Sequence, residues 1–244
     1  MRYILPEEAR KYVLYQVTDI LPKRNYSIFK KIRNRVKVIF NIANNDYKNF
    51  VLNTVKSKSL KIDQEYFAYA KKKADKFIKF IPPNIKTILD IGCGIAGVDI
   101  ILNEYLKFSK IYLLDKTKTE REIYYGFKKS GAFYSSLELA KETFKINGLN
   151  TNLIELIDAP NDGNIQIQKG SIDLVISTIS WGFHYPISTY LKSVFNLLND
   201  KGILILDLRN GETSNKELRK LLENFNIEII DSERKYLTIK CTKK

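Results

Sequence analysis

Short apolar runs rich in β-branched residues alternate with amphipathic segments from residue 86 to the end of the chain. Apolar runs of this length are typical of buried parallel strands, and apolar residues at i, i+3 and i+4 are typical of helices packed against a sheet. Only three residues, 232–234, separate the last two runs, so these two predict an antiparallel hairpin. The pattern therefore predicts an α/β fold with a seven-stranded, mostly parallel sheet. The expected strands are 86–91, 110–115, 152–157, 172–178, 202–208, 226–231 and 235–241, and the expected helices are 96–106, 135–147, 187–198 and 214–225.

Residues 1–80 have a different pattern and predict a helical N-terminal extension to a domain at 81–244. Apolar or aromatic residues recur at 66, 67, 70, 74, 77, 78 and 81, the spacing of an amphipathic helix, and Pro82-Pro83 ends it. A second basic amphipathic segment spans 27–40. The stretch 41–60 is rich in Asn, Ser and Lys, and it leaves a loop and a frayed helix as open interpretations.

Positive charge is concentrated in this extension. The whole chain carries a formal charge of +14; residues 1–80 hold 19 Lys and Arg against 7 Asp and Glu, and the remaining residues hold 22 against 20. A local basic field attracts phosphate, nucleic acid, a nucleotide-sugar or an anionic membrane surface. Solvated helix faces and a compositional bias toward lysine are the simpler explanations, although a bias would spread lysine over the whole chain.

Cysteines and apolar runs limit the class of protein. Cys93 and Cys241 are too few for a disulfide framework or a cysteine-based metal site, so we expect no metal and a reducing, cytoplasmic location. We find no uninterrupted apolar run near the roughly 20 residues of a transmembrane helix, and no signal-peptide hydrophobic region at the N-terminus.

A glycine-rich stretch follows the first predicted strand. GCGIAG at 92–97 matches G-x-G-x-x-G and precedes a predicted helix. Glycines permit a sharp turn and let the backbone approach a ligand at the carboxyl edge of a parallel sheet. By itself this motif fits dinucleotide enzymes as well as other nucleoside-binding proteins.

Acidic residues at the strand ends separate these possibilities. Asp90 precedes the glycines, where a carboxylate repels a pyrophosphate and attracts an ammonium group. Asp115 ends the second predicted strand, where a carboxylate can accept hydrogen bonds from both hydroxyls of a ribose. Singly, either acid is explained as a helix cap or a strand-end residue.

With these motifs, the region 86–244 resembles the Rossmann-like class I S-adenosylmethionine-dependent methyltransferases. LDIGCG at 89–94 is similar to the first motif of that family, and Asp115 and Asp158 match its ribose and adenine positions. The fourth and fifth strands match at 171–178 and 197–206. The resemblance implies S-adenosyl-L-methionine as cofactor. It implies cofactor-binding roles for Asp90, Gly92, Cys93, Gly94, Gly97, Asp115, Lys116, Asp158, Ala159 and Ser177.

An insertion departs from the family pattern. Between Asp115 and Asp158 lie 42 residues, more than one helix and one strand require. The extra segment, 116–135, contains Tyr124, Tyr125 and Tyr134, which we expect to bind substrate as part of a lid. The alternative is a loop whose aromatic residues pack on the surface of the domain.

Candidate catalytic residues follow the fourth and fifth strands. His184, the single histidine, has an unperturbed pKa that suits a general base; its alternatives are packing against the cofactor or capping a helix. Trp181 and Tyr185 are expected to line the substrate pocket, or to belong to the core. Asp207 is expected to position or deprotonate the acceptor, and Arg209 is expected to bind an anionic group of the substrate. The alternative is that Asp207 and Arg209 pair with each other.

Missing motifs narrow the reaction. The sequence has no Asn/Asp-Pro-Pro-Tyr after the fourth strand, which disfavours methylation of adenine or glutamine amino groups. It has no cysteine close behind the fourth or fifth strand and no Lys-Asp-Lys-Glu arrangement, which disfavours methylation of pyrimidine carbon-5 and of ribose 2′-hydroxyls. O-methylation and N-methylation of a small molecule remain, and of these we expect methyl transfer to a hydroxyl of a small molecule such as a sugar or nucleotide-linked sugar. An RNA methyltransferase and a non-catalytic binding module are the alternatives, and the sequence leaves the acceptor and oligomeric state open.

Overall fold

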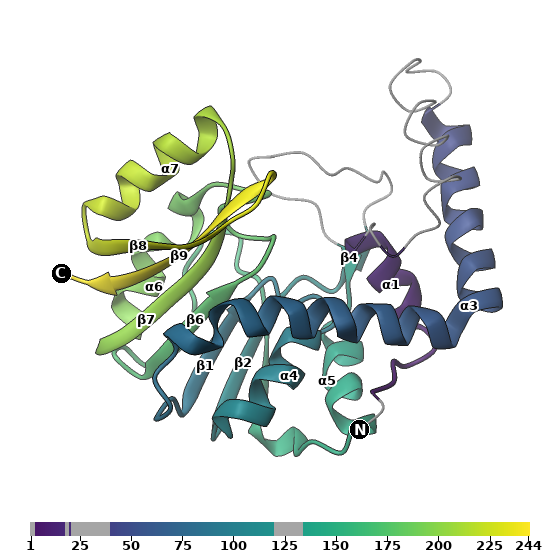
Figure 1. Ribbon diagram of the computed structural model, residues 1–244, viewed down its shortest axis with the longest axis horizontal. Helices are drawn as coiled ribbons and strands as arrows, with labels where there is room; N and C mark the ends of the chain where they lie inside the picture. The colour runs from purple at the N-terminus through teal and green to yellow at the C-terminus, as the bar shows by residue number, and fades with distance from the viewer. Residues whose placement is uncertain (1–2, 18–19, 21–39, 120–133) are drawn as a thin grey trace.

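Seven strands form one sheet in the order β5-β2-β1-β6-β7-β9-β8. The computed structural model describes residues 3–17, 20, 40–119 and 134–244 (Figure 1). The antiparallel β9 lies between β7 and β8, and the other neighbours pair in parallel. The predicted fold, with its C-terminal antiparallel hairpin, is therefore confirmed. The strands are β1 (Thr87–Ile91), β2 (Lys110–Asp115), β5 (Ile154–Asp158), β6 (Ile172–Ser177), β7 (Leu198–Arg209), β8 (Phe225–Ser232) and β9 (Tyr236–Lys243).

Alternating side chains divide the sheet between two hydrophobic cores. Ile88 of β1 faces a core shared with α1 (Ala9–Gln16), α3 (Phe40–Phe77), α4 (Gly97–Leu106) and α5 (Leu137–Ile146). Its neighbour Leu89 faces the opposite core, which includes residues of α6 (Leu191–Leu197) and α7 (Glu212–Leu222). Helices thus cover both faces of the sheet. This explains why the strands carry apolar residues at nearly every position, since both of their sides are buried.

The helix α3 extends further than the sequence pattern predicted. It begins at Phe40, so most of 41–60 is helical, and it changes direction at Lys58, where the backbone leaves helical geometry (φ −140°, ψ 28°). The part after Lys58 crosses one face of the sheet (Figure 1). A short 3-10 helix, η2 (Ile78–Phe80), then ends the segment ahead of Pro82.

The N-terminal helices are fixed to each other by a buried ion pair. Arg10 of α1 donates two hydrogen bonds of 2.8 Å, from Nε and Nη2, to the carboxylate of Asp63 on α3. Ala70, Ala74 and Phe77 of α3 are buried in the same core as the sheet. The boundary at residue 80 thus marks a change of secondary structure, and as a domain boundary it stays a prediction.

The predicted insertion begins and ends in a small antiparallel pair. β3 (Lys118–Thr119) pairs with β4 (Tyr134–Ser135), and η3 (Thr151–Leu153) precedes β5. Tyr124 and Tyr125 lie outside the described residues. The predicted helix at 187–198 is divided into η4 (Ile187–Thr189) and α6. None of the helices described is both long and apolar enough to span a membrane.

Candidate functional site

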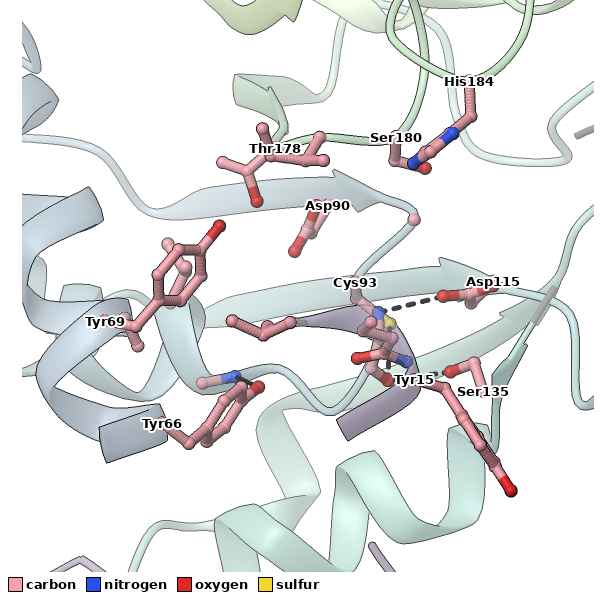
Figure 2. Close-up of a pocket in the computed structure, with 18 of the residues that line it drawn as sticks. Tyr15, Tyr66, Tyr69, Asp90, Cys93, Asp115, Ser135, Thr178, Ser180 and His184 are labelled. Carbon is pink, nitrogen blue, oxygen red and sulfur yellow. Dashed lines mark hydrogen bonds between the residues drawn. The ribbon is translucent and has the colours of Figure 1, made fainter. Parts of the chain in front are cut away.

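A pocket opens at the carboxyl ends of β1, β2 and β6, where parallel strands of an α/β sheet usually present a ligand site. Figure 2 shows the residues that surround it. They come from the glycine loop after β1, the turn after β6, the end of β2, and the N-terminal helices. The lining consists of Tyr15, Gln16, Val17, Tyr66, Tyr69, Ala70, Asp90, Gly92, Cys93, Gly94, Gly97, Val98, Asp115, Ser135, Thr178, Ile179, Ser180, His184 and Tyr185.

The glycine loop needs glycine at Gly92 for two reasons. Its φ is +81°, in the left-handed region, and a Cβ there would lie 1.8 Å from Ser180 Oγ. The N–H of Gly92 donates to Leu114 O (2.7 Å), which holds the loop against the end of β2. At Gly92 the loop therefore lies too close to the end of β2 and to the turn after β6 to leave room for a side chain.

Asp115 fixes the centre of the loop. Its carboxylate accepts hydrogen bonds from the N–H of Gly94 (2.9 Å) and of Lys116 (2.7 Å). Burial nevertheless raises the pKa of Asp115 to about 6, because desolvation of the carboxylate outweighs these hydrogen bonds. Ser135 Oγ donates to Gly94 O (2.9 Å), so the end of the insertion also contacts the loop.

Two further carboxyl groups lie beneath the loop without a compensating cation in the described residues. Asp90 is 3% exposed and Asp99, in the first turn of α4, is fully buried. Asp90 Oδ1 and both oxygens of Asp99 have no hydrogen-bond partner in the part of the chain that the structure describes. Burial, and then the charge of Asp99, raise the pKa of Asp90 well above its usual range; burial raises the pKa of Asp99 to about 7. Of the two, Asp90 lines the pocket, and its buried carboxyl group favours a positively charged ligand group there.

The turn after β6 forms the wall beside the glycine loop, where Ser180 lies next to Gly92. His184 and Ser180 lie side by side there (Figure 2), and the N–H of His184 donates to Ser180 O (2.7 Å). Tyr185 is 6% exposed, and its hydroxyl is 3.5 Å from Ser180 Oγ. His184 is thus at the pocket, as the sequence predicted, and its role as a base stays a prediction.

The N-terminal helices close the remaining side. Tyr66 of α3 accepts a hydrogen bond from the N–H of Gly97 (2.9 Å). A Cβ on Gly94 would lie 2.6 Å from Gln16 Oε1, at the end of α1. Tyr15 and Tyr69 complete this wall, with the Tyr69 ring across the pocket from Asp90 (Figure 2).

Several predicted cofactor residues lie beside the pocket rather than on its surface. Asp158 is exposed at the end of β5, next to Asp115 in register, and Ala159 N donates to Asp115 O (3.0 Å). The side chain of Lys116 contacts Asn161. Ser177 is fully buried; its hydroxyl donates to Ile91 O (2.7 Å) and accepts from Trp181 N (3.0 Å).

The predicted substrate and catalytic residues also separate into pocket and core. Trp181 is fully buried and its indole N–H donates to Ile187 O (3.0 Å), so it belongs to the core behind the pocket. Asp207 is fully buried and pairs with Lys73, whereas Arg209 Nε donates to Phe183 O (2.7 Å). Neither Asp207 nor Arg209 is among the lining residues, and they do not form the pair considered from the sequence. Of Tyr134 the structure describes the backbone in β4.

Asp99 and the pocket wall formed by the N-terminal helices were not predicted from the sequence. Asp99 stands among the apolar residues 98–102, and an acid within such a run is a signal of a buried carboxyl group. Tyr66 and Tyr69, three residues apart, share one helix face, but a helical pattern alone does not distinguish a core face from a pocket wall.

The chain is similar in fold to solved structures of known proteins. No family model matches the chain, and no curated protein matches its sequence. Among solved structures, the precorrin-6y C5,15-methyltransferase of Geobacter metallireducens matches with a TM-score of 0.50 at 16% identity, over 74% of this chain and 89% of its own. A SAM-dependent O-methyltransferase of Thermotoga maritima gives 0.52 at 14%, over 71% and 65%. A putative S-adenosylmethionine-dependent methyltransferase of Listeria monocytogenes gives 0.51 at 17%, over 72% and 99%. The chain has the fold of these methyltransferases, which confirms the predicted architecture.

Proposed function

We propose that this chain binds S-adenosyl-L-methionine and transfers its methyl group to an acceptor. The observation that carries the proposal is the buried, unpartnered Asp90 Oδ1 on the floor of a glycine-loop pocket, among the described residues. A buried carboxyl group is stabilised either by a proton or by a cation, and a ligand with a positively charged group would supply the cation.

The residues present fit this cofactor. Asp90 would hold the ammonium of its methionine part, and the backbone at Gly92 and Gly94 would lie against it, since side chains there would clash. Asp115, at the end of β2, would accept hydrogen bonds from the ribose. Asp158 and Ala159 stand at the neighbouring strand end and would contact the adenine.

When bound, S-adenosylmethionine supplies a methyl group already activated for direct displacement. The protein must then align the acceptor and accept its proton. We assign the proton transfer to His184, an imidazole at the pocket that can take a proton from a hydroxyl. His184 follows β6 and Asp90 lies on β1, so the acceptor and cofactor sides of the pocket are provided by different strands.

Binding of the product S-adenosylhomocysteine, measured by calorimetry, tests the cofactor. This product retains the ammonium group, so Asp90→Asn should weaken its binding about 10- to 100-fold through loss of one charge-assisted contact. Asp231→Asn, on β8 outside the pocket lining, is the matched control and should leave binding unchanged. No binding by the unmodified protein, or equal binding by both variants, would reject the proposal.

For the acceptor we favour a hydroxyl of a small, sugar-like or anionic molecule. The support is the chemistry of the turn after β6. This turn carries the imidazole of His184 and the hydroxyls of Ser180 and Tyr185. Formation of S-adenosylhomocysteine with a panel of sugars and nucleotide-linked sugars is the direct test. The substrate roles of Tyr124, Tyr125, Tyr134 and Arg209, and the cytoplasmic location, stay predictions.

An RNA acceptor is the alternative, and the charge of residues 1–80 favours it. RNA binding by that segment would weaken steeply with added salt, because phosphate contacts release counterions. Neutralising Lys30, Lys31, Arg33 and Arg35, which lie outside the described residues, should then reduce both affinity and salt slope. Absence of binding at low salt would remove this alternative, and cofactor binding without turnover on any acceptor would favour a non-catalytic module.

A further inference from the structure

Asp207 joins the N-terminal helix α3 to the turn that carries His184. The Asp207 carboxylate is fully buried and lies 2.7 Å from Lys73 Nζ of α3, itself 3% exposed. The same carboxylate accepts hydrogen bonds from Thr238 Oγ1 (2.6 Å) and from the backbone N–H of Ile179 (3.1 Å). Lys73 Nζ also lies 3.8 Å from the centre of the Tyr236 ring.

Ile179 has a strained backbone that requires support. Its φ is +52°, in the left-handed region, which a β-branched residue rarely adopts. Such a conformation persists only when the surrounding structure determines it, and it is concentrated at functional sites. Ile179 lines the pocket directly before Ser180, so its backbone sets the path of the turn toward His184.

Arg209, two residues further along β7, holds the other end of the same turn. Its Nε donates to Phe183 O (2.7 Å), and its backbone N–H donates to Gly182 O (3.2 Å). The guanidinium carbon also lies 4.2 Å from the centre of the Phe183 ring. Alternate residues of one strand therefore hold Ile179 on one side and Phe183 on the other.

We propose that Lys73, Asp207 and Arg209 are positioning residues that hold the turn 179–184 and thereby aim His184 at the pocket. The role of His184 in this proposal rests on the proposed function. Lys73 comes from the N-terminal helix, so the docking of α3 determines the geometry of the acceptor side of the site. Without Lys73, the buried Asp207 would be left uncompensated and would favour its protonated form, a weaker acceptor for the Ile179 N–H.

Two unique side chains report on this turn without knowledge of the acceptor. His184 is the single histidine and Trp181 the single tryptophan of the chain. The imidazole NMR signals of His184, the amide signal of Ile179 and the fluorescence of Trp181 can therefore be assigned to the turn. These signals respond to its local geometry, which a general loss of stability below the unfolding transition does not change.

The test compares Lys73→Met with Lys76→Met. Lys76 lies on the same helix and pairs with Asp231 and Glu233, outside the turn. We expect Lys73→Met to shift the His184 and Ile179 signals, to leave the S-adenosylhomocysteine dissociation constant within about threefold, and to lower kcat about 10- to 100-fold once an acceptor is known. Lys76→Met should leave the signals in place, and Lys73→Arg should restore them.

A second variant, Arg209→Lys, tests the same proposal if Lys73→Met does not fold. Arg209→Lys keeps the charge but loses the planar Nε donor to Phe183 O, and it should shift the same His184 signals. Unshifted signals in both Lys73→Met and Arg209→Lys, or equal shifts in Lys76→Met, would overturn the positioning role. Failure of the unmodified protein to bind S-adenosylhomocysteine would instead reject the proposed function, while the comparison of His184 signals would still decide whether Lys73 and Arg209 hold the turn.

Discussion

Tyr66 Oη accepts a hydrogen bond of 2.9 Å from the backbone N–H of Gly97, and both groups are buried. The bond joins the N-terminal helix α3 to the first residue of α4, whose N–H has no partner within its own helix. Burial raises the pKa of the Tyr66 phenol, so the group stays protonated at neutral pH. The glycine loop is thus completed by a residue about thirty positions earlier in the chain.

Tyr66→Phe should destabilise the protein by about 1–3 kcal/mol, because it leaves the Gly97 N–H buried without an acceptor. In a chain of this length that corresponds to a fall in Tm of roughly 2–12 °C, measurable by calorimetry. Tyr105→Phe removes an exposed hydroxyl bonded to Lys71 and Asp75, and it should change Tm little. Equal effects of the two substitutions would contradict this account of Tyr66.

Gly92→Ala should weaken ligand binding, since its Cβ would lie 1.8 Å from Ser180 Oγ and force the loop and turn apart. We expect affinity for S-adenosylhomocysteine to fall more than about 10-fold, as a displaced loop loses its ligand contacts. Gly148→Ala is the matched control: its φ is +77°, close to the +81° of Gly92, but its Cβ meets no described atom within 4 Å. This control should show only backbone strain, on the order of 1 kcal/mol, with unchanged affinity. Retained binding in Gly92→Ala would argue against the close approach.

Asp99→Asn should make the ligand-free protein more stable at pH 8. Burial raises the pKa of Asp99 to about 7, so the folded state holds this proton more tightly than the unfolded state does. Its stabilising contribution is therefore complete below about pH 4 and is lost as the pH rises through about 7. The variant should gain on the order of 2–4 kcal/mol at pH 8 and show a smaller fall in Tm between pH 5 and 8.

Asp231→Asn provides a comparison of opposite sign. Burial alone would raise the pKa of Asp231, but the hydrogen bond and charge of Lys76 lower it overall. That carboxylate therefore stabilises the fold above its unfolded pKa, and its removal should cost stability at neutral pH. A decrease in Tm at pH 8 for Asp99→Asn would show that Asp99 is compensated in the folded state.

His184→Ala should lower methyl transfer by roughly 10²–10⁴-fold and leave S-adenosylhomocysteine affinity nearly unchanged, as expected for loss of a general base. The assay is product formation with an accepted substrate across a pH series. Unchanged turnover in the variant would remove His184 as the base and leave it as a pocket wall.

Much of the architecture was predictable from local pattern. The strands β1, β2 and β6 were predicted to within one residue, because apolar runs bounded by charged or glycine residues signal buried strands directly. Prediction was less complete for α3, whose first half begins at Phe40 within a stretch of weak helical pattern. Likewise, Asp90 and His184 were recognised because Asp90 lies at the end of one strand and His184 follows another, at the edge where ligands bind.

Long-range pairing was not predictable in the same way. Asp207 and Arg209 were expected to act on the acceptor. In the structure Asp207 pairs with Lys73, and Arg209 donates a hydrogen bond to Phe183 O. These partners are distant in sequence, and nothing in the local pattern around residue 207 specifies a lysine on a helix more than a hundred residues earlier. The unpartnered state of Asp99 was equally hidden, since it depends on what α4 and β1 bring together.

By itself, the sequence determined the order of the strands along the chain, the glycine loop and the acids that follow the strands, because these depend on side-chain periodicity and on turn geometry within a few residues. Only the tertiary structure decided that α1 and α3 close the pocket and that Asp90 and Asp99 lie together without a cation in the described residues. It also decided that Lys73 pairs with Asp207, whose carboxylate holds the turn before His184. Those relationships arise from burial, which brings distant segments into contact and removes the water that would otherwise satisfy their charges.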